Sequence, residues 1–214
     1  MPVSWLTIPN VITVSRIAAC PVIFMLAVSS DTGARLWAFA LFIIAAVSDI
    51  FDGYLARKHG LVTDMGKLLD PVADKLLLVA TYVPIYIVSH GGGEDAGLPW
   101  WGPMPLWVIV VIFGREIFIT IFRSFAARRG VVIAAGIAGK RKALFQAIFA
   151  GAALLWYPLR ALAAERPGGL EAWSVWFAVH GAVTGATLAI ALVLTVYSLI
   201  DYMWSYRNLV GIRD

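Results

Sequence analysis

The chain has 214 residues, of which 61% are hydrophobic and only 14% are charged, and its mean hydropathy is +0.83. This composition excludes an ordinary soluble domain, in which about a quarter of the residues are charged. The net charge of +4 is modest, and no nucleic-acid partner is expected. The single cysteine, Cys20, excludes an internal disulfide and a thiolate metal cluster. The chain is therefore expected to be a membrane protein.

Six apolar stretches are long enough to cross a bilayer, which takes about 20 residues each. They cover residues 9–29, 35–58, 67–89, 103–126, 142–163 and 171–204. They leave no room for a separate soluble domain, so residues 1–214 are expected to form a single membrane domain. Residues 1–8 are expected to form a short interfacial segment. The predicted fold class is an all-α integral membrane protein with six transmembrane helices.

The first stretch carries three polar residues near its start, Asn10, Thr13 and Arg16. Residues three apart lie within about one turn of each other on a helix, so this spacing predicts a polar stripe at one end of the span. An alternative stays open, in which Asn10 caps the helix and Arg16 extends its side chain to water.

Four carboxylates gather where the second and third stretches meet. Asp49 and Asp52 lie near the end of the second stretch, and Asp70 and Asp74 lie near the start of the third. Spacings of three and four place each pair on one helix face, and the short link allows the two faces to meet. An ionised side chain at bilayer depth needs a partner, so the cluster is a candidate functional site. Its oxygen atoms suit one or two Mg²⁺ or Mn²⁺ ions.

Small and basic residues stand beside these carboxylates. Gly53 and Ala56 have almost no side chain, so they leave a slot that a flat group or a diphosphate can enter. Arg57 offers a planar guanidinium to phosphate oxygens. Two other readings stay open from the residues alone. In the first, the carboxylates form the ion site of a cation channel or transporter. In the second, they form ion pairs between helices, with Arg57, Lys67, Lys75 or Arg115 as partners.

Basic residues concentrate in alternate links between the apolar stretches. The link after the second stretch, the link after the fourth and the C-terminal tail hold Arg57, Lys58, Lys67, Arg128, Arg129, Lys140, Arg141, Lys142, Arg207 and Arg213. The positive-inside rule predicts that these links, the carboxylates and both termini face the cytoplasm.

The order Asp-x2-Asp-Gly-x2-Ala-Arg-x8-Gly-x3-Asp-x3-Asp, from Asp49 to Asp74, resembles the signature of the CDP-alcohol phosphotransferase family, and every fixed position is present. The opening Ile-Pro-Asn-Val-Ile-Thr-x2-Arg at residues 8–16, and the stretch 114–146, are similar to the bacterial phosphatidylglycerophosphate synthase branch of that family. One departure is Arg141-Lys142, where that branch has an aromatic residue or valine followed by Lys-Thr. The resemblance covers essentially the whole chain.

The resemblance implies a multi-pass enzyme of the bacterial cytoplasmic membrane, with its active site facing the cytoplasm and two copies forming a homodimer. It implies transfer of the phosphatidyl group from CDP-diacylglycerol to glycerol 3-phosphate. It also implies two divalent metals, Mg²⁺ or Mn²⁺, bound by Asp49, Asp52, Asp70 and Asp74, with Asp74 as general base as well. Two other acceptors stay open, namely inositol phosphate, and phosphatidylglycerol with cardiolipin as the product.

The resemblance also implies a binding pocket for the cytidine diphosphate group. Its expected residues are Gly53, Ala56, Arg57 and Gly66, together with Asn10 and Thr13 of the polar stripe.

The phosphate of the acceptor needs a cationic site, for which we expect Arg115, Arg123 and Lys140. The alternative is that these cations only reflect membrane topology and contacts with anionic lipids. Glu116 and Arg123 are seven residues apart on one helix face and are expected to pair.

Overall fold

A computed structural model describes residues 7–58, 63–92, 96–131 and 136–207, except for the side chains at positions 50, 52–57, 64 and 67. These ranges form seven helices and no β-sheet. The helices are α1 (Ile8–Val28), α2 (Thr32–Lys58), α3 (Asp64–Ser89), α4 (Leu106–Arg128), α5 (Ile137–Ala164), α6 (Gly169–Ala172) and α7 (Ser174–Ser205). The six long helices match the six predicted stretches, and the fold class is all-α as expected. Most of the predicted interfacial segment, residues 1–6, lies outside the described residues.

Five of the long helices, α1, α2, α3, α5 and α7, are apolar and long enough to cross a membrane. Helix α4 has 23 residues and contains Arg115, Glu116 and Arg123, so it is as long as a span but more polar. Its outer face is nevertheless apolar, with Ile117 58% and Ile121 64% exposed. Large apolar side chains on an outer surface are typical of a contact with lipid or with another protein. The architecture is that of a multi-pass helical membrane protein.

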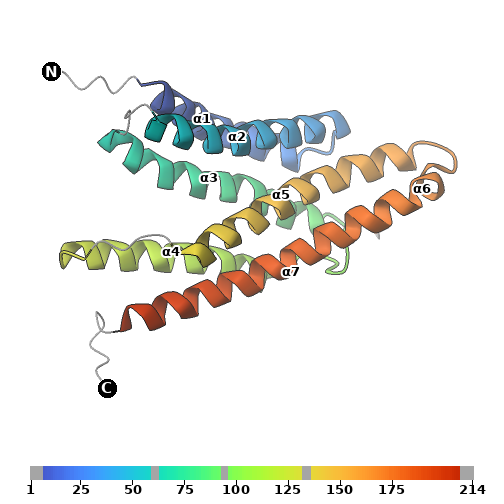
Figure 1. The fold of residues 1–214 in the computed structure, drawn as a ribbon. Helices are drawn as coiled ribbons and strands as arrows, with labels where there is room; N and C mark the ends of the chain where they lie inside the picture. Colours follow the sequence, from blue (N-terminus) through green and yellow to red (C-terminus); the bar gives the residue numbers. More distant parts are fainter. Residues whose placement is uncertain (1–6, 59–62, 93–95, 132–135, 208–214) are drawn as a thin grey trace.

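The helices form two groups that pack against each other (Figure 1). Helix α1 packs against α2 and α3, while α5 packs along α7 and against α2, and α4 packs against α7. Fully buried Tyr82, Ile112, Phe149 and Leu188 form the centre of the main apolar core, so α3, α4, α5 and α7 meet there. A smaller core around Ile23 holds α1 against α2 and α3.

Threonine side chains define where α1 and α3 begin. Thr7 precedes α1 and its hydroxyl accepts a hydrogen bond from the backbone N–H of Asn10 at 3.4 Å. Thr63 precedes α3 and accepts one from the N–H of Gly66 at 3.0 Å. Such caps satisfy backbone donors that have no partner within the helix. The cap by Thr63 therefore fixes where the aspartate-bearing face of α3 starts.

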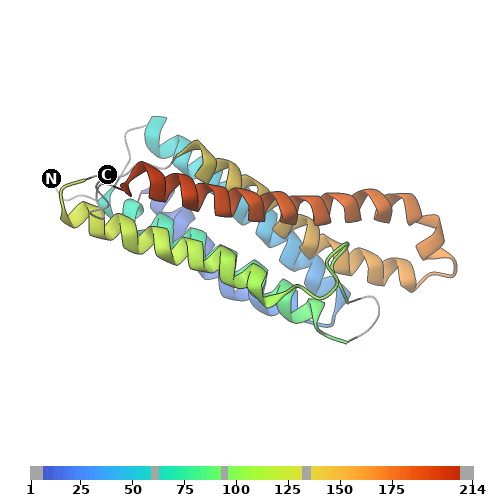
Figure 2. The same cartoon turned by 90° about the horizontal axis from the view of Figure 1, so that it is seen from below.

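Helix α1 begins, and α7 ends, at the same end of the bundle, as both ribbon views show (Figures 1 and 2). Helix α2 also ends there, α3 begins there, and α4 ends there. The start of α1, the end of α2 and the start of α3 carry Asn10, Asp49 and Asp70. The fold thus brings the predicted polar stripe and the predicted carboxylates to one end of the molecule.

Candidate active site

The polar stripe of α1 lies inside the bundle. Asn10, Thr13 and Arg16 are 5%, 2% and 2% exposed, respectively. The alternative in which Asn10 caps the helix and Arg16 reaches water is therefore wrong, because Thr7 is the cap and the arginine side chain is buried. Buried polar side chains need partners, and all three of these find them on α2 and α3 or in the link between them.

Arg16 joins carboxylates from two helices. Its Nη1 atom forms an ion pair with Oδ1 of Asp49 on α2 and lies 3.8 Å from Oδ1 of Asp74 on α3. The arginine side chain is 0% exposed, whereas those of Asp49 and Asp74 are 46% and 64% exposed. The two carboxylates therefore share one buried cation and keep open faces toward solvent or a ligand. Arg16 was not predicted as a partner of these aspartates, although its place in the polar stripe was the available signal.

Thr13 and Asn10 contact the start of α3. The Thr13 hydroxyl lies 3.1 Å from Oδ1 of Asp70 and also 3.1 Å from the carbonyl oxygen of Pro9, so its one proton is shared between two acceptors. Thr63 donates a hydrogen bond to Oδ1 of Asn10 at 2.9 Å. The predicted stripe on α1 and the predicted stripe on α3 therefore face each other directly.

Gly66 lies at a close contact between α1 and α3. A Cβ atom at this position would be 2.9 Å from Oδ1 of Asn10 and 3.2 Å from Oγ1 of Thr63. These two atoms are the donor and the acceptor of the hydrogen bond between Thr63 and Asn10. Close packing of the two helices is thus sufficient reason for a glycine here.

A cavity of about 380 Å³ opens beside the carboxylates, between α2, α3, α4 and α5. Its polar lining includes Asp49, Asp74, Glu116 and Lys142. The remaining lining residues are Phe42, Ala46, Lys75, Leu77, Leu78, Thr81, Tyr82, Ala143, Leu144, Gln146, Ala147 and Ala150. This volume, with a mostly apolar wall and a few convergent polar groups, is typical of small-molecule sites.

On the other side of this cavity, α4 and α5 contribute a second charged group. Oε1 of Glu116 forms an ion pair with Nζ of Lys142 and lies 3.1 Å from Nη1 of Arg115. Lys142 is only 4% exposed. The predicted pairing of Glu116 with Arg123 is wrong, because the Arg123 guanidinium instead lies 5.9 Å from the ring centre of Tyr202 on α7. Two cations share one carboxylate, so the group carries a net positive charge.

The three cations predicted for the acceptor phosphate lie in different surroundings. Arg115 is nearly buried beside Glu116, Arg123 lies against α7, and Lys140 is exposed at the start of α5. None of the three lines the cavity, whereas Lys142 does. Sequence reasoning missed Lys142 as a cavity residue, although its spacing of four from buried Gln146 marks one inner face of α5.

Several predicted site residues fall on side chains that the structure does not describe. Asp52, Gly53, Ala56 and Arg57 belong to α2, but their side chains lie outside the described residues. Among the side chains that are described, no three Asp, Glu, His or Cys residues are grouped to hold a metal. The part of the site that the structure describes therefore consists of Asp49, Asp70 and Asp74, with Thr13 and Arg16 of α1 as their partners.

The fold and this site define a class of protein, namely a multi-pass helical membrane protein with carboxylates that share a buried arginine beside a small-molecule cavity. The family model described as CDP-alcohol phosphatidyltransferase matches residues 6–197, which is most of the chain. The chain belongs to this family, and it is accordingly an enzyme of the CDP-alcohol phosphatidyltransferase type.

Curated relatives are similar over most of the chain. A protein of Mycobacterium tuberculosis named probable phosphatidylglycerophosphate synthase is 35% identical over 210 residues, covering 96% of this chain and 84% of its own. The CDP-diacylglycerol–glycerol-3-phosphate 3-phosphatidyltransferase of Bacillus subtilis is 38% identical over 69% of this chain and 76% of its own. A cardiolipin synthase (CMP-forming) of Streptomyces coelicolor is 32% identical over 58% of this chain and 54% of its own.

Proposed function

We propose that this enzyme transfers the phosphatidyl group from CDP-diacylglycerol to sn-glycerol 3-phosphate, with phosphatidylglycerophosphate and CMP as products. The observation that carries the proposal is the convergence of Asp49 and Asp74 on Arg16, beside a cavity whose other wall carries Lys142. The names of the relatives with the widest coverage support the same donor and acceptor.

In the proposed reaction, Asp74 is the general base. Its side chain is 64% exposed and lines the cavity, so an acceptor hydroxyl can approach it. The hydroxyl proton goes to Asp74, the acceptor oxygen forms a bond to the phosphorus that bears the diacylglycerol, and the bond from that phosphorus to the CMP oxygen breaks. Holding both substrates beside one base removes much of the entropic barrier to their meeting.

The proposed metal ligands are Asp49, Asp52, Asp70 and Asp74. Their oxygen donors fit Mg²⁺ or Mn²⁺, and the described carboxylates of Asp49 and Asp74 approach the same buried cation from two helices. Bound there, divalent ions would stabilise the negative charge of the diphosphate and of the reacting oxygens. Arg16, on α1, is proposed to keep the carboxylates of Asp49 and Asp74 together from the buried side of the site.

The proposed pocket for the cytidine diphosphate group lies along the hairpin of α2 and α3. It comprises Gly53, Ala56, Arg57 and Gly66, with Asn10 and Thr13 on the side of α1. The described support is that Asn10 and Thr13 contact the start of α3, next to Gly66 and Asp70.

For the acceptor phosphate we retain Arg115, Arg123 and Lys140 as proposed contacts and add Lys142. Lys142 lines the cavity together with Asp74, and Arg115 shares Glu116 with it. An ammonium group held at the wall of the same cavity by a half-buried carboxylate can orient a phosphate monoester without a large change in its own position.

We further propose six crossings of the bacterial cytoplasmic membrane, with both termini and the active site in the cytoplasm and with two copies forming a homodimer. Because α1 begins and α7 ends at the same end of the bundle, an even number of crossings is favoured (Figures 1 and 2). Helix α4 is then the sixth span, because its 23 residues are sufficient in length. The basic links at this end agree with the positive-inside rule.

The second candidate is the same chemistry with phosphatidylglycerol as acceptor, which the cardiolipin synthase among the relatives favours. Its coverage of 58% of this chain is lower than the 96% of the mycobacterial relative, so glycerol 3-phosphate is preferred. Inositol phosphate is the third acceptor to test. Family membership supports an enzyme over a cation transporter.

The decisive experiment measures CMP release by the purified protein with CDP-diacylglycerol and Mg²⁺. Each candidate acceptor is supplied in a separate reaction, with EDTA as the control for metal dependence. We expect EDTA-sensitive release with glycerol 3-phosphate, loss of release in Asp74→Asn, and retention in Asp201→Asn, which changes an exposed carboxylate on α7. Release with only another acceptor would overturn the proposed substrate, and release by Asp74→Asn would overturn the proposed base.

A further inference from the structure

Among the residues that the structure describes, three acidic side chains line the candidate active-site cavity, and the proposed reaction uses only two of them. Asp49 and Asp74 are assigned to metal binding and proton removal, whereas Glu116, on α4, has no assigned role. A charged side chain within a membrane-spanning bundle is costly, so each one calls for a functional explanation. Glu116 is therefore the unexplained charged group of this cavity.

Only one of the two carboxylate oxygens of Glu116 is occupied. Oε1 accepts hydrogen bonds from Nζ of Lys142 and from Nη1 of Arg115, the latter at 3.1 Å. Oε2 has no hydrogen-bond partner among the residues that the structure describes. Since the Glu116 side chain is 20% exposed and lines the cavity, this oxygen is available to a ligand there. A carboxylate oxygen only accepts hydrogen bonds, so the ligand group must be a donor, such as a hydroxyl.

The two cations on Oε1 offset the repulsion between this carboxylate and an anionic substrate. Lys142 and Arg115 carry two positive charges against the one negative charge of Glu116. Both cations lie at the boundary between α4 and α5, because a Cβ atom at Gly139, in the first turn of α5, would be 3.7 Å from Nη2 of Arg115. The cavity wall thus offers an ammonium donor and a carboxylate acceptor side by side. This pair is complementary to a phosphate and a nearby hydroxyl of one small molecule.

Three charged side chains of the cavity come from three different helices, namely Asp74 from α3, Glu116 from α4 and Lys142 from α5. Glycerol 3-phosphate likewise presents three polar groups on successive carbon atoms. They are the primary hydroxyl that reacts, the secondary hydroxyl and the phosphate. The proposed reaction assigns the first group to Asp74 and the last to Lys142, so the secondary hydroxyl is the group without a protein partner.

We propose that Oε2 of Glu116 accepts a hydrogen bond from the secondary hydroxyl of the acceptor, and that Glu116 thereby selects acceptors that carry this hydroxyl. The inference rests on the proposed function and names the residue that recognises the middle carbon of its substrate. Because Lys142 is bonded to Oε1 of the same carboxylate, the phosphate and the hydroxyl are held at a fixed separation. The carboxylate is already ordered before the acceptor binds, so little ordering entropy is lost.

The test compares two acceptors that differ only at this hydroxyl. Glycerol 3-phosphate and 3-hydroxypropyl phosphate both carry a primary hydroxyl and a phosphate, but only the first has the secondary hydroxyl. CMP release with CDP-diacylglycerol and Mg²⁺ gives kcat/KM for each acceptor. We expect the wild type to prefer glycerol 3-phosphate by about tenfold, the usual effect of one hydrogen bond to a charged group. Glu116→Leu, which keeps the size of the side chain but accepts no hydrogen bond, should abolish this preference. Glu116→Gln should reduce it, because a neutral acceptor bonds a hydroxyl more weakly.

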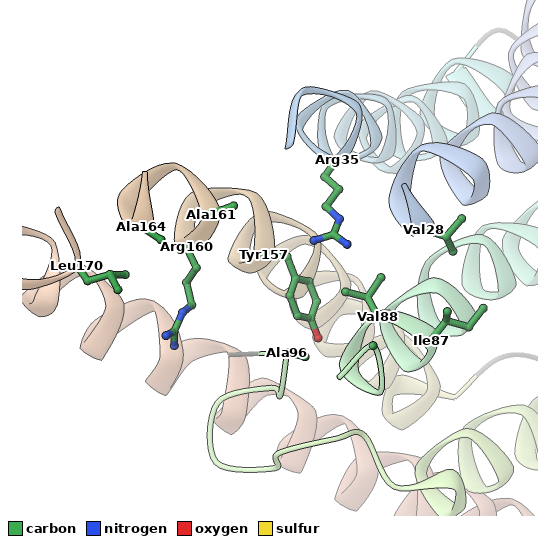
Figure 3. A pocket seen from close by; sticks show the side chains of 11 residues that line it. Val28, Arg35, Ile87, Val88, Ala96, Tyr157, Arg160, Ala161, Ala164 and Leu170 are labelled. Atoms are coloured by element: carbon green, nitrogen blue, oxygen red, sulfur yellow. The ribbon is translucent and has the colours of Figure 1, made fainter. Parts of the chain in front are cut away.

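Two controls separate the hydroxyl contact from a general change in the cavity. Lys142→Met removes the ammonium that Glu116 holds, so it should lower kcat/KM for both acceptors equally and leave the preference unchanged. Arg35→Gln alters a contact of α5 at the opposite end of the bundle, where the Arg35 guanidinium is directed toward Tyr157 (Figure 3). It should change neither the preference nor the KM for glycerol 3-phosphate.

The outcomes distinguish this inference from the proposed function. A wild type that uses both acceptors equally well would overturn the hydroxyl contact while leaving the proposed reaction intact. The contact is also wrong if Glu116→Leu and Glu116→Gln keep the wild-type preference, or if Lys142→Met loses the preference as completely as Glu116→Leu. Absence of CMP release by the wild type with either acceptor would overturn the proposed function, and the inference with it.

Discussion

Replacing Arg16 by methionine tests the central electrostatic feature of the candidate active site. Methionine keeps much of the side-chain volume in the α1 interface but removes the cation. In the native chain the guanidinium is 0% exposed and contacts Asp49 and Asp74. The variant therefore leaves two carboxylates, from two different helices, without their shared counter-charge.

The expected loss of stability follows from the burial of Arg16 and from the partial exposure of its two carboxylate partners. Removing one member of a fully buried ion pair costs about 3–5 kcal/mol. Asp49 and Asp74 are 46% and 64% exposed, so water solvates them in the variant and the loss falls to about 2 kcal/mol. For a chain of this length, about 2 kcal/mol corresponds to a decrease in Tm of about 4–8 °C.

Divalent cations make this prediction specific. Without the competing guanidinium, the two carboxylates attract Mg²⁺ more strongly, and a ligand that binds the folded state stabilises it in proportion to its affinity. The rise in Tm on adding Mg²⁺ should therefore be larger in Arg16→Met than in the wild type. Thermal unfolding in detergent, with and without Mg²⁺, measures both effects without relying on catalysis.

The matched control is Arg123→Met, which removes a half-buried arginine that contacts the ring of Tyr202. It should lower Tm but leave the response to Mg²⁺ unchanged. An unchanged Tm in Arg16→Met would refute the role of the arginine as counter-charge. A smaller response to Mg²⁺ than in the wild type would show that the arginine assists cation binding rather than competing with it.

Four further predictions concern the catalytic base, the helix contact and the acceptor site. Asp74→Asn should lose turnover while still binding CDP-diacylglycerol in a pull-down with labelled lipid, and full activity would remove Asp74 from the mechanism. Gly66→Ala should cost about 1–3 kcal/mol because its Cβ would lie 2.9 Å from Oδ1 of Asn10. Combining it with Asn10→Ala should recover part of that stability, and strictly additive losses of Tm would contradict the steric account. Lys142→Met should raise the KM for glycerol 3-phosphate by about tenfold, as expected for one lost charged hydrogen bond, whereas an unchanged KM would assign Lys142 to the Glu116 pair alone. Lys140→Ala is expected to raise the same KM, and no change would assign this exposed lysine to lipid or topology.

Helix positions were largely predictable because membrane spans are continuous apolar segments. The six predicted stretches correspond to α1, α2, α3, α4, α5 and α7. Their ends were predicted less accurately, since caps such as Thr63 depend on one local hydrogen bond rather than on hydropathy. Composition also could not indicate that α4 directs its charges inward, while Ile117 and Ile121 face outward.

The site was predictable where it depends on spacing within one helix. The interval of three between Asn10, Thr13 and Arg16 correctly indicated one face of α1, and the interval of four between Asp70 and Asp74 indicated one face of α3. Pairings across helices were not accessible in this way. Glu116 was expected to pair with Arg123 seven residues later, but it contacts Lys142, which is 26 positions away in the chain.

The sequence by itself therefore determined the membrane environment, the helical segments, the family signature and the shared face of the polar residues on α1 and on α3. These properties depend on hydropathy and on the 3.6-residue period, which are local. Only the tertiary structure decided which faces meet, that Arg16 compensates Asp49 and Asp74, and that Lys142 shares their cavity. Such contacts result from the packing of helices that are distant in sequence, and no local pattern encodes them.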